Sequence, residues 1–543
     1  MVWWWLIACG GGDPAPKTSE PVPSTLPAPT SSTPEPTTPT PTDSGPTDTG
    51  STDTGTPPAE PLVDCAALGL AVHPWQAGGT AWSPRALAGE VAASTTRGPL
   101  VLSEVWSGCE VVLVLPDDPL QEDTDLWSEQ AVADLADALP PHALLVVGSL
   151  DGDAGFVADV EGWLAATELG DRAWVVDEAL VGLDGWLGEA MTATPWGFGI
   201  DRQQQVRYVG SFADVDKYNV SVGWWDGTLA MAALEVPHWD FEAERQARLD
   251  AEVGTTVVPL WSGEVVEDPG WAGQRGEVTV TLPADLSGFD TLEADLDLGC
   301  GGVGELGYCP AWDYLVYLYV CAEGETTCGT ELGRWITTYH REGRWVHDLT
   351  PLLPLLEGGE TTFQFYSQQP YTVDLSLRLS TQGKARPTAA TPLFRGGELN
   401  AELNQRAAVE VSIPATATKV ELATVISGHG QVGFATCAEF CVLEHRFGFD
   451  GEFVELSYPL AGTERGCEEA VGDGTVPNQY GTWWFGRNGW CPGKEVPVER
   501  TDVTHLVTPG STVAVDFEVL RNGVEIELAG ARAEVESWLV VYE

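Results

Sequence analysis

The chain has 543 residues, with 81 acidic against 26 basic side chains and a formal net charge of −55. This balance excludes nucleic acid as a partner, because phosphates require a basic surface, and it favours a soluble, self-repelling exterior outside the cell. The length is too great for one compact domain, so about three domains are expected.

The chain opens with a short apolar segment, residues 1–9, which ends in Leu6-Ile7-Ala8-Cys9. This ending resembles the lipidation box of bacterial lipoprotein signals, in which the cysteine carries the lipid. The segment of residues 1–9 is too short to span a bilayer. Residues 10–61 are rich in Pro, Thr, Ser, Gly and Asp, so they predict a disordered tether. We expect an exported protein, lipid-anchored to the bacterial cell envelope and exposed at its surface. A linker without an anchor is the alternative.

Residues 62–254 alternate between strand and helix patterns. The apolar runs are short and continuous, as buried parallel strands are, and they lie at 110–115, 143–147 and 173–177. Helical spacing occurs near 132–139, 156–164 and 187, and a helix is expected over 241–253. Two further strands follow Pro195. This order resembles the thioredoxin-like fold, in which the bond to such a proline is cis.

A redox role for this domain lacks its second thiol. The thioredoxin active site requires Cys-x-x-Cys after the first strand, but residues 116–124 contain no cysteine. Cys109 lies before or within that strand and can pair with Cys65. We therefore favour a structural or partner-binding role, with a thiol oxidoreductase as the alternative.

From about residue 255 the pattern is that of β-structure with many turns. Expected strands of a first block lie at 314–320, 332–338, 361–367 and 371–379, after an alternating stretch over 278–300. Residues 380–397 are interpreted as a linker. Expected strands of a second block lie at 408–413, 418–426, 440–449, 452–459, 512–520 and 534–542. We predict two β-sandwiches packed side by side, over 255–388 and 389–543.

The 11 cysteines indicate an oxidising compartment. Apart from Cys9, they suggest the disulfides Cys65–Cys109, Cys300–Cys309, Cys321–Cys328, Cys437–Cys441 and Cys467–Cys491. Zinc is the alternative at 437 and 441, but no nearby His or second cysteine pair completes a four-ligand set.

Asp313 is the first candidate for chemistry, because it lies between Trp312 and Tyr314 just before a predicted strand. A rigid loop that delivers an acid to the end of a strand can build a catalytic site, although strand capping explains the same residues. In the second block, Glu439 lies inside a small cysteine-bounded loop, and Arg487 precedes Cys491. Small disulfide loops also stiffen sandwiches, and Arg487 can simply neutralise a surface acid.

Taken together, five motifs in residues 255–543 resemble the peptide-N-glycosidase F family in order and spacing. They are Cys309–Asp313 (CPAWD), Gly333–Tyr339 (GRWITTY), Val425–Gln431 (VISGHGQ), Cys437–Cys441 (CAEFC) and Arg487–Gly493 (RNGWCPG). The resemblance implies two jelly-roll β-sandwiches with a sugar-binding cleft at their interface. The whole chain is then a multidomain protein: an α/β thioredoxin-like domain followed by two jelly rolls.

The resemblance also implies an activity, the hydrolysis of the amide between an Asn side chain and the first N-acetylglucosamine of an N-glycan. The products are a peptide with Asp and a glycosylamine that decays to free sugar. N-glycosylated proteins or peptides are the expected partners, the protein is expected to be a monomer, and no metal or cofactor is implied. The sequence has no His-x-His or His-Glu-x-x-His motif that would suggest a metal centre.

The resemblance assigns three catalytic residues. Asp313 falls on the principal carboxylate, as base or nucleophile, and Glu439 on the glutamate that holds or activates a water. Arg487 falls on an arginine suited to stabilising developing charge or the Asp313 carboxylate. Trp312 and Trp490 match aromatic residues near the family's site.

Several departures fall where the sugar is gripped. Gln368 replaces the family's third acidic residue and can still form a hydrogen bond, but without charge. Tyr314 replaces an arginine, and His429 and Gln431 replace a tryptophan and a histidine. These changes put the substrate range in question. They motivate an alternative function, a catalytically weakened glycan-binding or adhesion protein on the same double sandwich.

Overall fold

The computed structural model of the chain describes residues 62–117, 126–210, 228–267, 274–300, 309–322, 325, 328–430, 438–526 and 531–543. Residues 1–60 and 61–543 are separate units. The expected signal segment, the tether and Cys9 all lie outside the described residues. No helix within the described ranges is long and apolar enough to cross a membrane.

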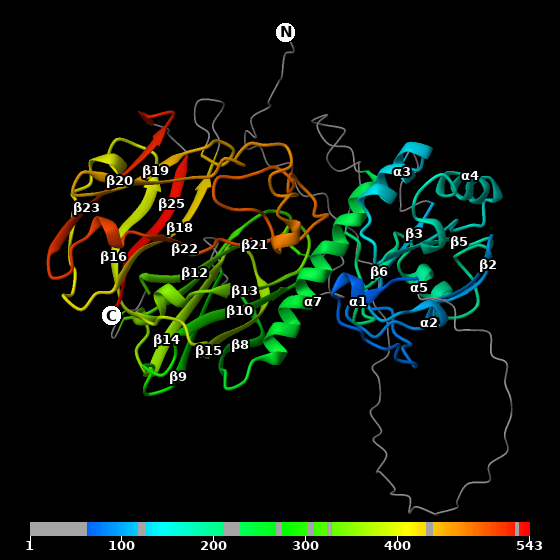
Figure 1. Cartoon of the computed structure of the whole chain (residues 1–543), viewed down its shortest axis with the longest axis horizontal. Coiled ribbons are helices and arrows are strands. Elements are labelled where there is room, and N and C mark those ends of the chain that lie inside the picture. The colour runs from blue at the N-terminus through cyan, green and yellow to red at the C-terminus, as the bar shows by residue number, and fades with distance from the viewer. Residues whose placement is uncertain are drawn as a thin grey trace, which may run out of the picture. The chain divides into compact units, whose positions relative to one another are not determined.

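Residues 62–251 form an α/β domain around a five-stranded sheet in the order β5-β4-β3-β6-β7 (Figure 1). The strands of this sheet are β3 (Val111–Pro116), β4 (Ala143–Gly148), β5 (Ala173–Val175), β6 (Phe198–Ile200) and β7 (Val206–Arg207). A separate hairpin consists of β1 (Ala92–Thr95) and β2 (Gly98–Val101). The helices are α1 (Cys65–Leu68), α2 (Leu102–Val105), α3 (Glu129–Ala138), α4 (Ala154–Leu164), α5 (Trp186–Ala193) and α7 (Glu235–Ala251).

Both faces of this sheet are buried, which explains the continuous apolar runs. Alternate residues of β3 enter two different cores, Val111 and Leu113 on one face and Val112 and Val114 on the other. Strands β3, β4 and β5 are parallel and β6 and β7 are antiparallel, as the strand and helix pattern predicted. The thioredoxin-like assignment itself remains a prediction.

Two details of this domain bear on the sequence predictions. Cys65 and Cys109 form the predicted disulfide, which ties α1 to the start of β3. The expected cis bond at Pro195 is wrong, because the described residues contain no cis peptide bond. Pro195 instead directly follows Thr194, the C-terminal cap of α5, whose non-helical backbone suits a residue before a trans proline.

The first β-sandwich pairs a four-stranded sheet, β13-β10-β15-β8, with a five-stranded sheet, β21-β12-β11-β14-β9. Its strands are β8 (Thr256–Val266), β9 (Gln274–Leu282), β10 (Thr291–Gly299), β11 (Leu315–Val320), β12 (Thr330–Ile336), β13 (Gly343–Asp348), β14 (Gly359–Ser367) and β15 (Tyr371–Ser380). The predicted disulfides Cys300–Cys309 and Cys321–Cys328 are present, and the second closes the β11–β12 hairpin.

The second β-sandwich pairs the sheet β16-β25-β18-β22 with the sheet β17-β23-β19-β20, and β24 adds to β23. Its strands are β16 (Pro387–Glu398), β17 (Val409–Ser412), β18 (Lys419–His429), β19 (Glu444–Phe449), β20 (Glu452–Ser457), β22 (Glu499–Asp502), β23 (Thr512–Arg521), β24 (Val524–Glu525) and β25 (Arg532–Tyr542). The linker predicted over 380–397 is therefore wrong. Strand β16 is an edge strand with bulges, the position in a sheet where prolines are tolerated.

The two sandwiches share a core. Ala423 and Val425 of β18 pack into the core of the first sandwich, whereas Leu422 and Ile426 of the same strand enter the core of the second. The short strand β21 (Lys494–Glu495) belongs to the second block of sequence but pairs with β12 of the first sandwich. The chain that carries Arg487 is therefore attached to both sandwiches.

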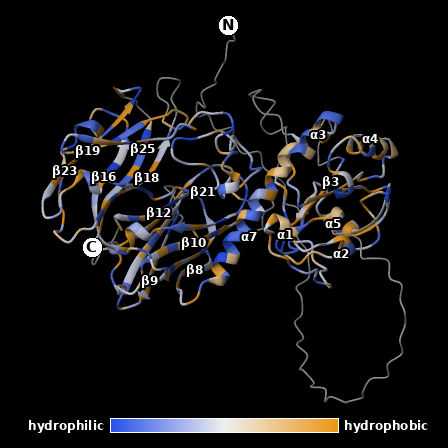
Figure 2. Cartoon of the chain, in the orientation of Figure 1, coloured by the Kyte–Doolittle hydropathy of each residue, from blue (hydrophilic) through white to orange (hydrophobic). Residues whose placement is uncertain are grey.

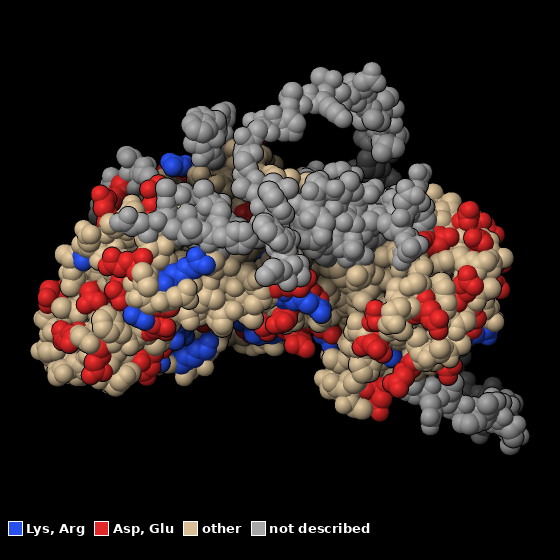
Figure 3. All heavy atoms as spheres, turned by 90° about the horizontal axis from the view of Figure 1, so that it is seen from above, with Lys and Arg blue, Asp and Glu red and all other residues tan. Residues whose placement is uncertain are grey.

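Surface charge and hydropathy agree with the composition. Acidic side chains are spread widely over the described surface seen in Figure 3, whereas basic ones are few. Figure 2 shows hydrophilic residues along α7. Some of them are buried, among them Glu235, His238 and Glu242. A polar residue in such a place requires hydrogen-bond or charge partners.

Candidate active site

Asp313 lies in a backbone turn held on both sides by Thr337, the residue that follows β12. The Tyr314 N–H donates to the Thr337 hydroxyl at 2.8 Å, and that hydroxyl donates to the Trp312 carbonyl at 3.0 Å. The Thr337 N–H donates in turn to the Tyr314 carbonyl at 2.9 Å. These bonds give Asp313 a defined position at the start of β11.

Glu439 and Arg487 come from two loops of the second sandwich that are hydrogen-bonded to each other. The Asn488 N–H donates to the Glu439 carbonyl at 2.8 Å, and the Gly428 N–H donates to the Asn488 carbonyl at 2.9 Å. Both loops are thereby tied to the end of β18. Cys441 is disulfide-bonded, but its predicted partner Cys437 lies outside the described residues.

The structure brings the three predicted catalytic residues together. The Arg487 guanidinium lies 3.7 Å from the Asp313 carboxylate and 3.4 Å from the Glu439 carboxylate. Its side chain is 0% exposed, whereas the Asp313 and Glu439 side chains are 16% and 20% exposed. A buried cation therefore lies between two carboxylates that are both partly exposed to solvent. The two carboxylate residues, Asp313 and Glu439, are more than a hundred positions apart in the sequence.

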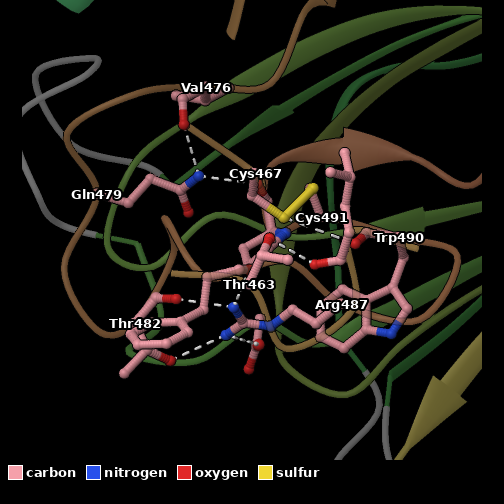
Figure 4. Close-up of a disulfide and its surroundings, with 12 residues drawn as sticks. Thr463, Cys467, Val476, Gln479, Thr482, Arg487, Trp490 and Cys491 are labelled. Carbon is pink, nitrogen blue, oxygen red and sulfur yellow. Dashed lines mark hydrogen bonds and ion pairs between the residues drawn. A yellow bond between two sulfur atoms is a disulfide. The ribbon is translucent and has the colours of Figure 1, made fainter. Parts of the chain in front are cut away.

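The Arg487 side chain is held firmly by its own loop. It donates to the Thr482 carbonyl at 2.7 Å, the Thr482 hydroxyl at 2.9 Å and the Phe485 carbonyl at 2.6 Å. The guanidinium also lies over the rings of Phe440 and Trp490. Figure 4 shows it directed at Thr482, beside the Trp490 ring and near the predicted Cys467–Cys491 disulfide, which is present. A planar, multiply bonded guanidinium is fixed in orientation as well as in place.

Tyr339, which lies in the GRWITTY motif, is a further residue of the site. Its buried side chain forms a hydrogen bond with the Asp313 carboxylate, and its hydroxyl lies 3.4 Å from an Arg487 nitrogen. Its backbone N–H donates to the Gln479 side chain at 2.8 Å. The signal in the sequence was its place as the last residue of the GRWITTY motif, shortly after the strand β12.

The electrostatics of the two carboxyl groups favour acid–base chemistry. Burial raises the pKa of Glu439 to about 7, Arg487 opposes this rise and the negative charge of Asp313 adds to it. Burial also raises the pKa of Asp313, against the opposing effects of Arg487 and the Tyr339 hydroxyl. Near neutral pH, Glu439 therefore exchanges readily between its protonated and ionised forms.

The aromatic residues divide into one exposed ring and one internal ring. Trp312 is 59% exposed beside Asp313, and an exposed flat ring suits the apolar face of a sugar. Trp490 is only 6% exposed and donates from its indole N–H to the Gly428 carbonyl at 2.7 Å. It lies against Arg487, so its contribution is mainly to orient that side chain.

His429 stacks on Trp490, with ring centroids 4.9 Å apart, and its Nε2 lies 2.8 Å from the Ser427 hydroxyl. Burial and then the nearby arginines Arg334, Arg532 and Arg487 lower the pKa of His429 to about 3. The ring is therefore neutral under ordinary conditions, and the residue as a whole is only partly buried.

Gln368 and Tyr314 occupy the rim near Asp313. Gln368 is exposed just after β14, and its side chain has no hydrogen bond to another of the described residues. Its neighbour Gln369 instead forms a hydrogen bond with the half-buried Tyr314 side chain. Of the two glutamines, Gln369 is therefore the one fixed in place.

These observations define a double β-sandwich protein whose site is an arginine between two carboxylates. A profile of the family described as "Peptide-N-glycosidase F, C terminal" matches residues 399–539. The peptide-N(4)-(N-acetyl-beta-D-glucosaminyl)asparagine amidase F of Elizabethkingia miricola is 27% identical over 279 residues, which cover 45% of this chain and 72% of that protein. These matches support membership of the peptide-N-glycosidase F family for the C-terminal part of the chain, as its motifs predicted.

Solved structures are also similar to part of the chain. PNGase F, a glycosylasparaginase from Flavobacterium meningosepticum, matches with 21% identity and a TM-score of 0.44, over 54% of this chain and 96% of that chain. PNGF-II matches with 14% identity and a TM-score of 0.40, over 55% of this chain and 67% of that chain.

Proposed function

We propose that this protein is an amidase that hydrolyses the bond between an Asn side chain and the first N-acetylglucosamine of an N-glycoprotein or glycopeptide. The observation that carries the proposal is the buried Arg487 between the carboxylates of Asp313 and Glu439, at 3.7 and 3.4 Å. Membership of the peptide-N-glycosidase F family supports the same reaction class.

The reaction balances with water alone. A water adds to the amide carbonyl carbon, the carbon–nitrogen bond breaks, and the glycosylamine leaves with a proton while the peptide keeps a new carboxyl group. Asp313 accepts a proton from the water as it adds to the carbonyl, and this proton passes to the amide nitrogen as the carbon–nitrogen bond breaks. Glu439, with its pKa near 7, binds the water by a hydrogen bond and can exchange a proton with that water.

Arg487 has a different task in this reaction. Negative charge develops on the carbonyl oxygen as the water adds, and a fixed, desolvated guanidinium stabilises such charge without having to reorient. The bonds from Arg487 to Thr482 and Phe485 fix that orientation before substrate binds. The exposed Trp312 ring is the proposed platform for the sugar next to the cleaved bond.

Location and assembly follow as further parts of the proposal. The disulfides of the described residues support an exported protein, because such bonds persist in oxidising compartments. We propose anchoring through a lipid on Cys9, surface exposure and action as a monomer. Metabolic labelling with a clickable fatty acid, compared between wild type and Cys9→Ser, tests the anchor.

The activity is tested by incubating the purified protein with a denatured N-glycoprotein. Released glycan and conversion of the glycosylated Asn to Asp, both read by mass spectrometry, are the expected results. Asp313→Asn should abolish release, whereas Asp374→Asn, at an exposed position on β15, should not. Intact glycoprotein after long incubation at high enzyme concentration would rule the proposal out. Glycan binding that persists in Asp313→Asn without any turnover would favour a binding protein instead.

A further inference from the structure

The loop that carries Arg487, residues 474–490, has an outer side that contacts the α/β domain and an inner side that faces the site. The buried amide of Asn478 donates to the Met231 carbonyl at 2.9 Å and to the Glu235 carboxylate at 2.9 Å. A longer bond reaches the Val209 carbonyl at 3.4 Å. One side chain of the second sandwich therefore bonds three residues, in two segments, of the α/β part of the chain.

Glu235, the first residue of α7, also binds the first sandwich. Its carboxylate receives hydrogen bonds from Arg341 at 2.8 and 3.3 Å, and both side chains are buried. Arg341 donates in addition to the carbonyl of Pro477, next to Asn478. The two side chains thus neutralise each other's charge. Through Arg341, they also connect α7 to the loop at Pro477.

Apolar contacts extend this attachment along the loop. Trp483 and Trp484 are buried in the core that includes β3, β4 and α3 of the α/β domain. Gly474 has a φ of +99°, and a Cβ there would lie 2.6 Å from the Phe241 ring of α7. The backbone at this end of the loop therefore lies directly against the helix, where only glycine fits.

The inner side of the same loop forms the site. Thr482 and Phe485 accept the hydrogen bonds that orient Arg487. Gln479, next to Asn478, holds the backbone of Tyr339, which in turn bonds to Asp313. Outer and inner contacts alternate along one short stretch, so displacing the outer side also displaces the inner side.

We propose that the α/β domain positions the Arg487 loop, and that Asn478 is the positioning residue through which it acts. The inference rests on the proposed amidase function for its effect on rate, but the ordering of the loop is independent of it. The α/β domain would then support the Arg487 loop, a role that requires no redox dithiol. The domain is then a fixed support for a catalytic arginine that belongs to another domain.

The test uses Asn478→Gly in the full chain. Asn478 has a φ of +45°, which glycine adopts without strain, so the variant removes the amide bonds and leaves the Glu235–Arg341 pair in place. Asn522→Gly is the matched control, because Asn522 also has a positive φ, +52°, but lies exposed in the turn after β23. Glu252→Gln controls for loss of another contact of this region, the pair with Arg378.

Two measurements are made on folded protein. Hydrogen exchange over residues 474–490 should accelerate about tenfold or more in Asn478→Gly and in neither control. On a glycopeptide, kcat per folded molecule should fall about tenfold while KM stays within about twofold, because a misplaced guanidinium weakens the transition state more than substrate binding. A residue needed only for stability would reduce the folded fraction and leave kcat per folded molecule unchanged.

The outcomes are separable. Unchanged exchange over 474–490 in folded Asn478→Gly, or equal acceleration in Asn522→Gly, overturns the inference. If Asn478→Gly does not fold, Phe241→Leu loosens the same loop at Gly474 more gently and is judged by the same criteria. If the wild-type protein releases no glycan, the proposed function fails, and the exchange result alone decides whether the α/β domain holds the loop.

Discussion

Replacing Arg487 with Met removes the cation that lies between the two carboxylates while keeping a long apolar side chain against Trp490. The guanidinium donates hydrogen bonds to Thr482 and Phe485 and is 0% exposed. Removing one partner of such a buried charged cluster costs about 3–5 kcal/mol of stability. Loss of one fixed donor to the developing oxyanion costs about 3–4 kcal/mol in the transition state, or about 10²–10³-fold in kcat.

The pH dependence gives a second, independent readout of Arg487→Met. Arg487 lowers the pKa of both carboxyl groups, against burial, so its removal raises both values. If the ionised Asp313 is the base, the acid limb of the rate profile must move to higher pH. Arg487→Lys is the matched control, because it retains the charge but lacks the planar fork, and its limb should move less.

The assay is the initial rate of glycan release from a purified glycopeptide between about pH 5 and pH 8, the range in which folded proteins tend to be most stable. Folded fraction is measured in parallel by circular dichroism. An Arg487→Met enzyme that keeps its kcat within about threefold of wild type, with an unmoved acid limb, would refute the role given to the guanidinium.

Three further predictions concern neighbouring residues. Glu439→Gln should raise the free energy of unfolding relative to wild type mainly at high pH. Protonation of Glu439 favours the folded state below pH 4.5, and the wild type loses this contribution as the pH rises through about 7. Urea titrations should therefore show the neutral variant more stable by at most about 3 kcal/mol at pH 8 and by little at pH 4. In Tyr339→Phe, the Asp313 carboxylate loses a donor, so its pKa rises and the acid limb of the rate profile moves to higher pH, with kcat reduced about tenfold; an unmoved limb would exclude this contact as the cause. In Trp312→Ala, KM should rise about tenfold while the melting temperature stays unchanged, because the ring is 59% exposed and supports no core; a lower melting temperature with unchanged KM would show that the ring is structural.

Much of the fold was predictable because burial leaves a periodic record in the chain. Strands β3 and β4 are buried on both faces and appear as continuous apolar runs, and β11 and β15 alternate because each has one face in a core. Four of the predicted disulfides are present among the described residues, since close cysteine spacing restricts their partners.

Two edge strands have weaker sequence patterns: β8 was not predicted, and β16 was predicted as a linker. Strand β8 contains Pro259, and β16 contains Pro387, Pro392 and two adjacent glycines, residues that ordinarily mark loops. Both strands lie at the end of a sheet, where one side of the backbone is unpaired and proline costs little. At Gly396 a Cβ would lie 1.8 Å from the Ala533 carbonyl, so the glycine reflects close approach to β25 and not a flexible linker.

The candidates for the site can be identified from the sequence alone: Asp313 before a strand, Glu439 in a cysteine-bounded loop and Arg487 before Cys491. The sequence could not determine that a buried guanidinium joins the two carboxylates, because that distance depends on the packing of two sandwiches around a shared core. Nor could it indicate that the α/β domain grips the Arg487 loop, since Asn478 and Glu235 lie far apart in the chain and carry no local pattern. Contacts between distant segments, and the desolvation that shifts their pKa values, exist only once the chain is folded.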